Sequence, residues 1–130
     1  MKIKFASIYV DDQETALKFY RDKLGFKVKQ DDAYGPDTRW LSVVSPEDES
    51  GVALLLEKAS KDDGTKQFQE QLFKKGKPAA SFGVADLDKQ YKELTEKGVE
   101  FTSEPTERSY GGKDAVLKDG CGNLINLHQE

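Results

Sequence analysis

The sequence is poor in the residues that most often carry redox, metal or nucleophilic chemistry. Among its 130 residues there is one cysteine, Cys121, and one histidine, His128. A single cysteine excludes an internal disulfide framework and suits a reducing compartment, so we expect a cytoplasmic protein. A single histidine excludes any site that needs two histidines from one chain.

Long apolar runs are missing as well. Runs such as residues 51–56 fall far short of the roughly 20 residues that a membrane span requires. The first five residues lead directly into an alternating strand pattern and show neither the charged nor the apolar region of a signal peptide. We therefore expect no membrane segment and no signal peptide.

The charge of the chain is mixed and mildly acidic. There are 20 basic and 24 acidic residues, for a net charge of −4, and basic clusters such as residues 74–77 are short. A nucleic-acid-binding domain usually has a basic face and a high pI, so no nucleic-acid partner is expected. The length is that of one ordinary domain that can bury its own core.

The first half of the chain predicts the order strand, helix, strand, strand, strand. Ile3–Val10 alternates as a strand, Asp12 is placed to cap a helix from Gln13 to about Leu24, and Gly25 ends that helix. Further strands are expected over residues 26–29, 38–44 and 52–57, separated by a loop at 31–37 and a turn at 45–51.

The second half repeats this order. A strand is expected at 79–84, a helix capped by Asp86 that ends at Gly98, and strands at 99–102, 114–117 and 123–128. Asp12 and Asp86 lie 86 − 12 = 74 residues apart, and each follows a valine by two positions. Such repetition indicates two units that bury their apolar faces on each other. The alternative is an ordinary α+β domain in which the repetition is coincidental.

Three motifs resemble the vicinal oxygen chelate superfamily, which contains glyoxalases, bleomycin-resistance proteins and extradiol dioxygenases. They are Ile8-Tyr9-Val10-Asp11-Asp12 followed by Leu24-Gly25-Phe26, then Phe82-Gly83-Val84-Ala85-Asp86, and finally Asp119-Gly120-Cys121-Gly122-Asn123-Leu124-Ile125. The resemblance implies an α+β fold with two βαβββ modules that curl around a shared cavity. It divides a single domain, residues 1–130, into module one (1–57), a connector (58–78) and module two (79–130). Within the connector, residues 64–73 predict a short amphipathic helix.

The resemblance also implies where a divalent metal ion would bind in the metal-dependent members. The four ligand positions fall on Phe5, Ala79, Asn126 and the strand 52–57, where the position is Leu54, or Glu57 after a shift of register. Phenylalanine and alanine have no lone pairs to donate, and a neutral amide is a poor substitute for a carboxylate. We therefore predict that the protein holds no metal ion and no other cofactor.

Strand alternation extends these positions into a candidate pocket. Ser7 and Tyr9 share the face of Phe5, whereas Arg39 and Trp40 are neighbours, so at most one of them lines the pocket. The complete candidate set is Phe5, Ser7, Tyr9, Arg39, Trp40, Leu54, Glu57, Ala79, Ser81, Asn126 and His128. It describes a mostly apolar cavity suited to an organic ligand. The alternative is that the aromatic side chains fill this space as core.

Three functions remain open from the sequence. The first is a metal-independent protein that binds a small organic molecule, similar to the bleomycin-resistance branch. The second is a lyase, isomerase or dioxygenase with a displaced or non-metal site, for which Glu57, His128 or a Cys121–His128 pair would supply the chemistry. The third is an interaction module without a ligand. Many members of the family that this chain resembles form dimers through their open modules, so we expect a homodimer.

Overall fold

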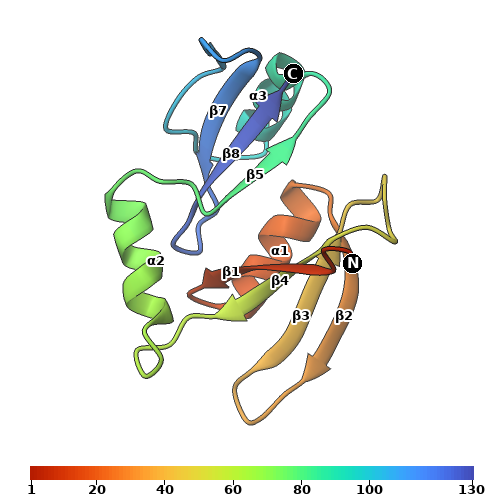
Figure 1. Ribbon diagram of the computed structural model, residues 1–130, viewed down its shortest axis with the longest axis vertical. Coiled ribbons are helices and arrows are strands. Elements are labelled where there is room, and N and C mark those ends of the chain that lie inside the picture. Colours follow the sequence, from red (N-terminus) through yellow and green to blue (C-terminus); the bar gives the residue numbers. More distant parts are fainter.

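The computed structural model describes residues 1–130 and contains two four-stranded sheets with helices, as the sequence predicts (Figure 1). The first sheet has the order β1-β4-β3-β2 and the second has the order β5-β8-β7-β6. No helix is both long and apolar enough to cross a membrane. The elements of the first module are β1 (Phe5–Val10), α1 (Gln13–Lys18), η1 (Phe19–Lys23), β2 (Lys27–Ala33), β3 (Arg39–Val44) and β4 (Ala53–Lys58).

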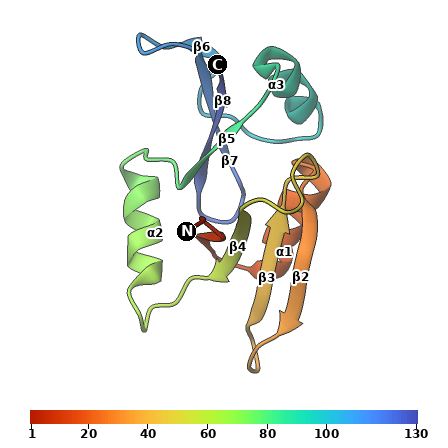
Figure 2. The same ribbon diagram turned by 45° about the vertical axis from the view of Figure 1, so that its right-hand side comes forward.

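The second module follows the connecting helix α2 (Thr65–Lys74), which stands beside both modules in the two views (Figures 1 and 2). Its elements are β5 (Ala80–Gly83), α3 (Leu87–Glu96), β6 (Thr106–Glu107), β7 (Lys113–Lys118) and β8 (Leu124–Gln129). In each module the first strand pairs parallel with the last, and the remaining pairs are antiparallel. The fold is therefore α+β with two βαβββ modules.

The helix caps predicted from the two aspartates are confirmed. The Oδ2 of Asp12 accepts a hydrogen bond from the Thr15 amide at 2.8 Å, and the Oδ1 of Asp86 accepts one from the Lys89 amide at 3.2 Å. Both carboxylates satisfy a backbone donor that the first helical turn leaves free. The helix after Asp12 continues as the π-helix η1, so the single α-helix predicted over this range is wrong in its last turns.

The strand predicted at residues 99–102 is also wrong. This segment makes only an isolated bridge between Phe101 and Leu117, while the Phe101 ring packs on Tyr91 with centroids 4.6 Å apart. The outer strand of the second sheet is instead β6, directly after Pro105. Conversely, β2 extends to Ala33, further than predicted, because it pairs with β3 along its whole length apart from one register shift.

A single hydrophobic core joins the two modules. Sixteen buried residues form one cluster, which includes Val10, Tyr20 and Leu56 from the first module and Leu94 and Ile125 from the second. The two modules therefore share one core, in which each buries part of the other's apolar surface.

Buried hydrogen bonds fix the turn between β7 and β8 against the first module. The Tyr20 hydroxyl donates to Asp119 Oδ2 at 2.6 Å, and Asn123 Nδ2 donates to the same oxygen at 3.0 Å and to the Tyr9 carbonyl at 2.7 Å. Burial, together with the adjacent Asp119 carboxylate, raises the pKa of the Tyr20 phenol well above its ordinary value. The Tyr20 hydroxyl therefore remains a hydrogen-bond donor at any physiological pH.

Helix α2 completes this junction through Gln69, which is buried. Its Nε2 donates to the carbonyls of Cys121 at 2.8 Å and Tyr9 at 3.0 Å. Gly122 has a positive φ of 97°, and a Cβ placed on it would lie 2.4 Å from that nitrogen. A glycine is therefore required at Gly122 both by the backbone conformation and by the close approach of α2.

We predict that Tyr20→Phe lowers the free energy of unfolding by about 1–3 kcal/mol, because a buried carboxylate loses one of its donors. Chemical denaturation followed by circular dichroism measures this change. Tyr34→Phe is the control, since Tyr34 is 68% exposed, and its variant should unfold like the wild type. Equal stability of the Tyr20→Phe variant and the wild type would contradict the role assigned to this hydrogen bond.

Candidate functional site

The first sheet has one face covered by α1 and one open face. On β1, Ile8 and Val10 are buried against the helix side, whereas Phe5, Ser7 and Tyr9 alternate with them. Their partners on β4 are Ala53, Leu55 and Glu57. We call this surface the first open face, and it carries Phe5, Ser7, Tyr9, Gln30, Trp40, Leu55 and Glu57.

An aromatic pair stands on the first open face. The rings of Phe5 and Trp40 meet edge to face with centroids 5.9 Å apart and planes at 86°. Trp40 Nε1 donates to Gln30 Oε1 at 3.0 Å, which fixes the orientation of the indole. Phe5 is nevertheless 44% exposed and Trp40 39% exposed, so the alternative in which they fill the core is wrong.

Arg39 points to the other face of the same strand. Its guanidinium makes a two-pronged ion pair with Asp31, with N–O distances of 2.7 and 2.9 Å, and reaches Glu14 at 2.9 Å. The hydrogen bond to Asp31 raises the pKa of Arg39 above its already high value, and burial opposes this only in part. Of the two neighbours, Trp40 is thus the one on the open face.

The register of β4 corrects the expected position of Leu54. Leu54 pairs with Ala6 and packs against the core, whereas Leu55 pairs with Ser7 on the open face. Strands β3 and β7 keep the offset of 74 residues, but β4 and β8 differ by 124 − 53 = 71, because the turn after β3 is longer. Leu55 is therefore the counterpart of Asn126.

A cavity of about 500 Å³ opens at the end of the first open face where β3 and β4 diverge. Gln13 bridges the gap from α1, since its Nε2 donates to the carbonyls of Arg39 and Leu56, each at 2.8 Å. The lining residues are Tyr34, Thr38, Arg39, Trp40, Leu41, Leu55, Glu57, Lys58, Ala59, Ser60 and Asp63. Trp40 thus borders a hollow that can hold an organic group, whereas Phe5 packs on Trp40 but does not line the hollow. Arg39 lines the same hollow, so the expectation that at most one of the two neighbours lines a pocket is wrong for this cavity.

The second sheet has a corresponding open face, which is more polar. Ser81 pairs with Asn126, and Asn126 Nδ2 donates to Ser81 Oγ at 3.0 Å. Ala79 precedes β5 and is half-buried, with its amide bonded to the Leu124 carbonyl. We call this surface the second open face, and it carries Ala79, Ser81, Asp114, Asn126 and His128.

A histidine–carboxylate pair lies on the second open face. His128 Nδ1 is 2.6 Å from Asp114 Oδ1, and the other carboxylate oxygen is bonded by Arg108 Nε at 3.3 Å and by the Tyr110 hydroxyl. Burial alone raises the pKa of Asp114, but hydrogen bonds from Tyr110, His128 and Asn126 outweigh burial and lower the pKa to about 2. Asp114 is thus an anion that orients the imidazole.

Sequence reasoning missed Asp114, Tyr110 and Arg108. Asp114 is the cross-strand partner of His128, and a pairing between strands is not visible in the alternation of either strand alone. The 74-residue offset between the modules could have identified Asp114, because it relates Asp114 to Trp40, a candidate pocket residue.

The four positions that the family would use for a metal ion do not fit one. They are Phe5, Leu55, Ala79 and Asn126, which together offer one neutral amide oxygen. No group of three or more histidine, cysteine or carboxylate side chains is arranged elsewhere to hold an ion. Glu57 lies on the first sheet, whereas His128 and Asp114 lie on the second and bond to each other.

The option that Cys121 and His128 form a nucleophile and base is wrong. Cys121 precedes β8 and His128 lies near its far end, about seven residues of extended chain or ~20 Å away. Cys121 is also 1% exposed, and burial, reinforced by Asp119, raises the pKa of its thiol to about 12. It is a core residue.

The shared pocket expected from the sequence remains a prediction. Neither of the two principal cavities combines Phe5, Ser7 or Tyr9 with Asn126 or His128. Ser81 borders the cavity that lies between the modules, which is described below.

The sequence and the fold both match known proteins. Residues 2–127 match the family described as the Glyoxalase/Bleomycin resistance protein/Dioxygenase superfamily. The uncharacterized protein YurT of Bacillus subtilis (strain 168) is 48% identical over 130 residues, which cover 100% of both chains. The crystal structure of UcmS2 is 30% identical, with a TM-score of 0.83 and coverage of 98% of this chain and 97% of that one. TnmS3, described as an antibiotic binding protein from Streptomyces sp. CB03234, is 25% identical, with a TM-score of 0.76 and coverage of 99% and 95%.

We predict that the Cys121 thiol does not react with an aromatic disulfide reagent at pH 8 in the folded protein, because the reactive thiolate is scarce and shielded. Absorbance of the released thiolate measures the reaction, and the same protein in denaturant should release one equivalent. Rapid release from the native protein would show that the turn containing Cys121 opens readily.

Proposed function

Since the chain belongs to the Glyoxalase/Bleomycin resistance protein/Dioxygenase superfamily, we propose that it is a metal-independent protein that binds a small organic molecule on its open faces. The observation that carries the proposal is the exposed Phe5–Trp40 pair, of which Trp40 lines a cavity. Exposed aromatic rings held in a fixed geometry offer a large apolar contact area to a planar ligand. The antibiotic-binding description of TnmS3 supports an antibiotic-like ligand.

The side chains at the four family positions support metal independence. Phe5, Leu55 and Ala79 cannot donate an electron pair, and Asn126 already donates its amide nitrogen to Ser81. Elemental analysis of the purified protein should find no stoichiometric zinc, nickel, manganese or iron. About one ion per chain that is removed by a chelator with loss of structure would refute this part of the proposal.

A second copy of the chain would complete the site. Within one chain Phe5 and Trp40 are exposed, although Phe68 of α2 packs on Tyr9 and Asp114 is buried. A homodimer that stacks the first open face of one copy near the second open face of the other would enclose a ligand. It would also cover Phe5 and Trp40, whose exposure is costly in water. We therefore predict a mass of twice 14.6 kDa by light scattering, whereas a monomeric mass at tens of micromolar would contradict the dimer.

The ligand proposal is tested through Trp40, which is the only tryptophan and so reports directly from the site. A panel of aromatic antibiotics that includes metal-free bleomycin is titrated while the fluorescence of Trp40 is recorded. At least one compound should change the emission in a saturable manner. Phe5→Ala should weaken its binding about tenfold or more, because a Phe side chain contributes roughly 1.5–3 kcal/mol when it is buried.

Phe73→Ala is the matched control, since Phe73 is an exposed aromatic residue on α2 and should leave binding unchanged. If no compound changes the emission while the protein is dimeric, the role of an interaction module without a ligand takes the place of this proposal.

A second candidate function is proton transfer by His128. The 2.6 Å contact of Asp114 with Nδ1 leaves Nε2 as the ring nitrogen that can accept a proton from a bound molecule. This geometry fits a lyase or isomerase that removes a proton next to a carbonyl group. It is an enzyme site only if a substrate reaches Nε2 on the second open face.

Deuterium uptake by dihydroxyacetone in D2O, followed by NMR, tests the proton-transfer candidate. Catalysed exchange that is lost in His128→Asn and reduced in Asp114→Asn would support it. Ser81→Ala is the control for general damage to the face, since the Ser81 hydroxyl bonds neither Asp114 nor His128. No exchange above the uncatalysed rate for the wild type would leave binding as the function.

A further inference from the structure

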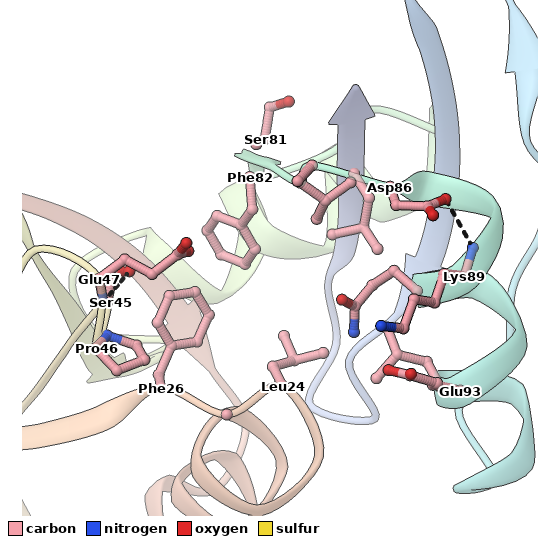
Figure 3. Close-up of a pocket in the computed structure, with 17 residues that line it drawn as sticks. Leu24, Phe26, Ser45, Pro46, Glu47, Ser81, Phe82, Asp86, Lys89 and Glu93 are labelled. Atoms are coloured by element: carbon pink, nitrogen blue, oxygen red, sulfur yellow. Dashed lines mark hydrogen bonds between the residues drawn. The ribbon is translucent and has the colours of Figure 1, made fainter. Parts of the chain in front are cut away.

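A cavity of about 570 Å³ lies between the modules, on the helix side of β5 (Figure 3). Its floor is apolar, and the rings of Phe26 and Phe82 meet edge to face there, with centroids 5.1 Å apart and planes at 71°. Figure 3 shows Ser45, Pro46 and Glu47 on one side of these rings and α3 on the other. Phe82 alternates with Ser81 and Gly83 along β5, so the cavity lies mainly on the side of the sheet opposite the second open face and meets that face only at Ser81.

The internal repeat places a second, equivalent site in the molecule. We call the site where the turn after β7 meets β1 the first junction, and the site where the turn after β3 meets β5, which holds this cavity, the second junction. In the first junction the space is filled. By the 74-residue offset, Gly83 and Ala85 correspond to Tyr9 and Asp11, and Ser45 corresponds to Asp119. In the first junction, the turn after β7 packs onto β1 and is held there by Gln69 of α2. The second junction has the same backbone but no such insertion.

The filled junction shows which chemical groups satisfy the exposed edge of the first strand. Asn123 Nδ2 donates to the Tyr9 carbonyl at 2.7 Å, and the Asp11 amide donates to the Cys121 carbonyl at 3.0 Å. Gln69 Nε2 also donates to the Tyr9 carbonyl, at 3.0 Å. The edge therefore takes amide N–H groups at its carbonyl and one carbonyl oxygen at its N–H.

The equivalent groups of β5 have no partner outside their own sheet. The Val84 amide points inward and donates to the His128 carbonyl at 2.8 Å, so the Gly83 carbonyl and the Ala85 N–H point to the outer edge. The Ala85 amide makes no hydrogen bond, and both residues line the cavity. The turn after β3 does not reach them, because the Asp48 and Gly51 amides bond back within that turn.

The charges around the rim restrict the ligand further. Glu47, Asp86 and Glu93 line the cavity together with a single cation, Lys89. Three carboxylates against one ammonium group disfavour an anion and admit a neutral or cationic molecule.

We propose that this cavity binds a small neutral or cationic molecule in which an amide is joined to an aromatic group. The amide N–H donates to the Gly83 carbonyl, and the amide oxygen accepts from the Ala85 N–H. The aromatic group lies on Phe26 and Phe82, whose ring edges and faces both suit such contacts. This site does not depend on the function proposed for the open faces.

The experiment is a titration of ¹⁵N-labelled protein with N-(2-phenylethyl)acetamide, followed by two-dimensional NMR. The Ala85 amide resonance should move downfield in a saturable manner, with a dissociation constant in the millimolar range typical of a fragment. The Asp11 amide is the internal control, since its bond to Cys121 leaves it no acceptor to gain. The ester 2-phenylethyl acetate should bind about tenfold more weakly, because it leaves the Gly83 carbonyl unpaired.

Gln90→Trp places a large side chain in the cavity from α3 and should abolish the shift of Ala85. Trp40 indole and His128 resonances that stay in place in the variant show that it is folded. If this variant is unfolded, Lys89→Glu replaces it, since Lys89 lies at an exposed position of the rim. This substitution should weaken the binding of an anionic analogue and leave the affinity for the amide unchanged. Equal affinity of amide and ester, shifts confined to Trp40 and Asn126, or no shift of Ala85 would each overturn the proposal.

Discussion

The hydrogen bonds that converge on Asp119 hold the two modules in one arrangement. Its carboxylate is 1% exposed and accepts from the Tyr20 hydroxyl, the Asn123 side chain and the amides of Cys121 and Asn123. A buried carboxylate is tolerated only when it is fully hydrogen-bonded, so these groups must assemble together. Their assembly carries the turn after β7 onto β1 and fixes how one sheet lies relative to the other.

This constraint acts at only one of the two equivalent junctions. Helix α2 occurs once in the chain, and the turn after β3 lacks the Asp-Gly-Cys-Gly-Asn sequence that packs the first junction. The second junction keeps its aromatic floor but leaves the edge of β5 uncovered. A near-symmetric backbone therefore has asymmetric surfaces, and the asymmetry arises from the turns rather than from the strands.

The two open faces also differ in chemistry, although their strands correspond. The first presents Phe5 and Trp40, and the second presents Ser81, Asn126 and a histidine held by a buried carboxylate. The first face offers apolar contact and the second offers hydrogen bonds. That division suits a ligand with an aromatic body and a polar end, which is the pattern of most small-molecule sites.

The sequence by itself determined the order of the elements, the repeat, the two helix caps and the absence of metal-binding side chains from the family positions. These features are local: a cap needs one aspartate, and alternation along β1 places Phe5, Ser7 and Tyr9 on one face. Alternation also indicated that Arg39 and Trp40 point apart, but not which of them faces the ligand.

The tertiary structure decided everything that depends on register and packing between distant segments. It placed Leu55 rather than Leu54 on the open face, set Asp114 opposite His128, and turned Arg39 toward Asp31 and Glu14. It buried Cys121 and left the edge of β5 free. A pairing between strands is fixed by contacts far apart in the chain and by turn lengths, so a shift of one residue reverses every side chain without altering the local pattern.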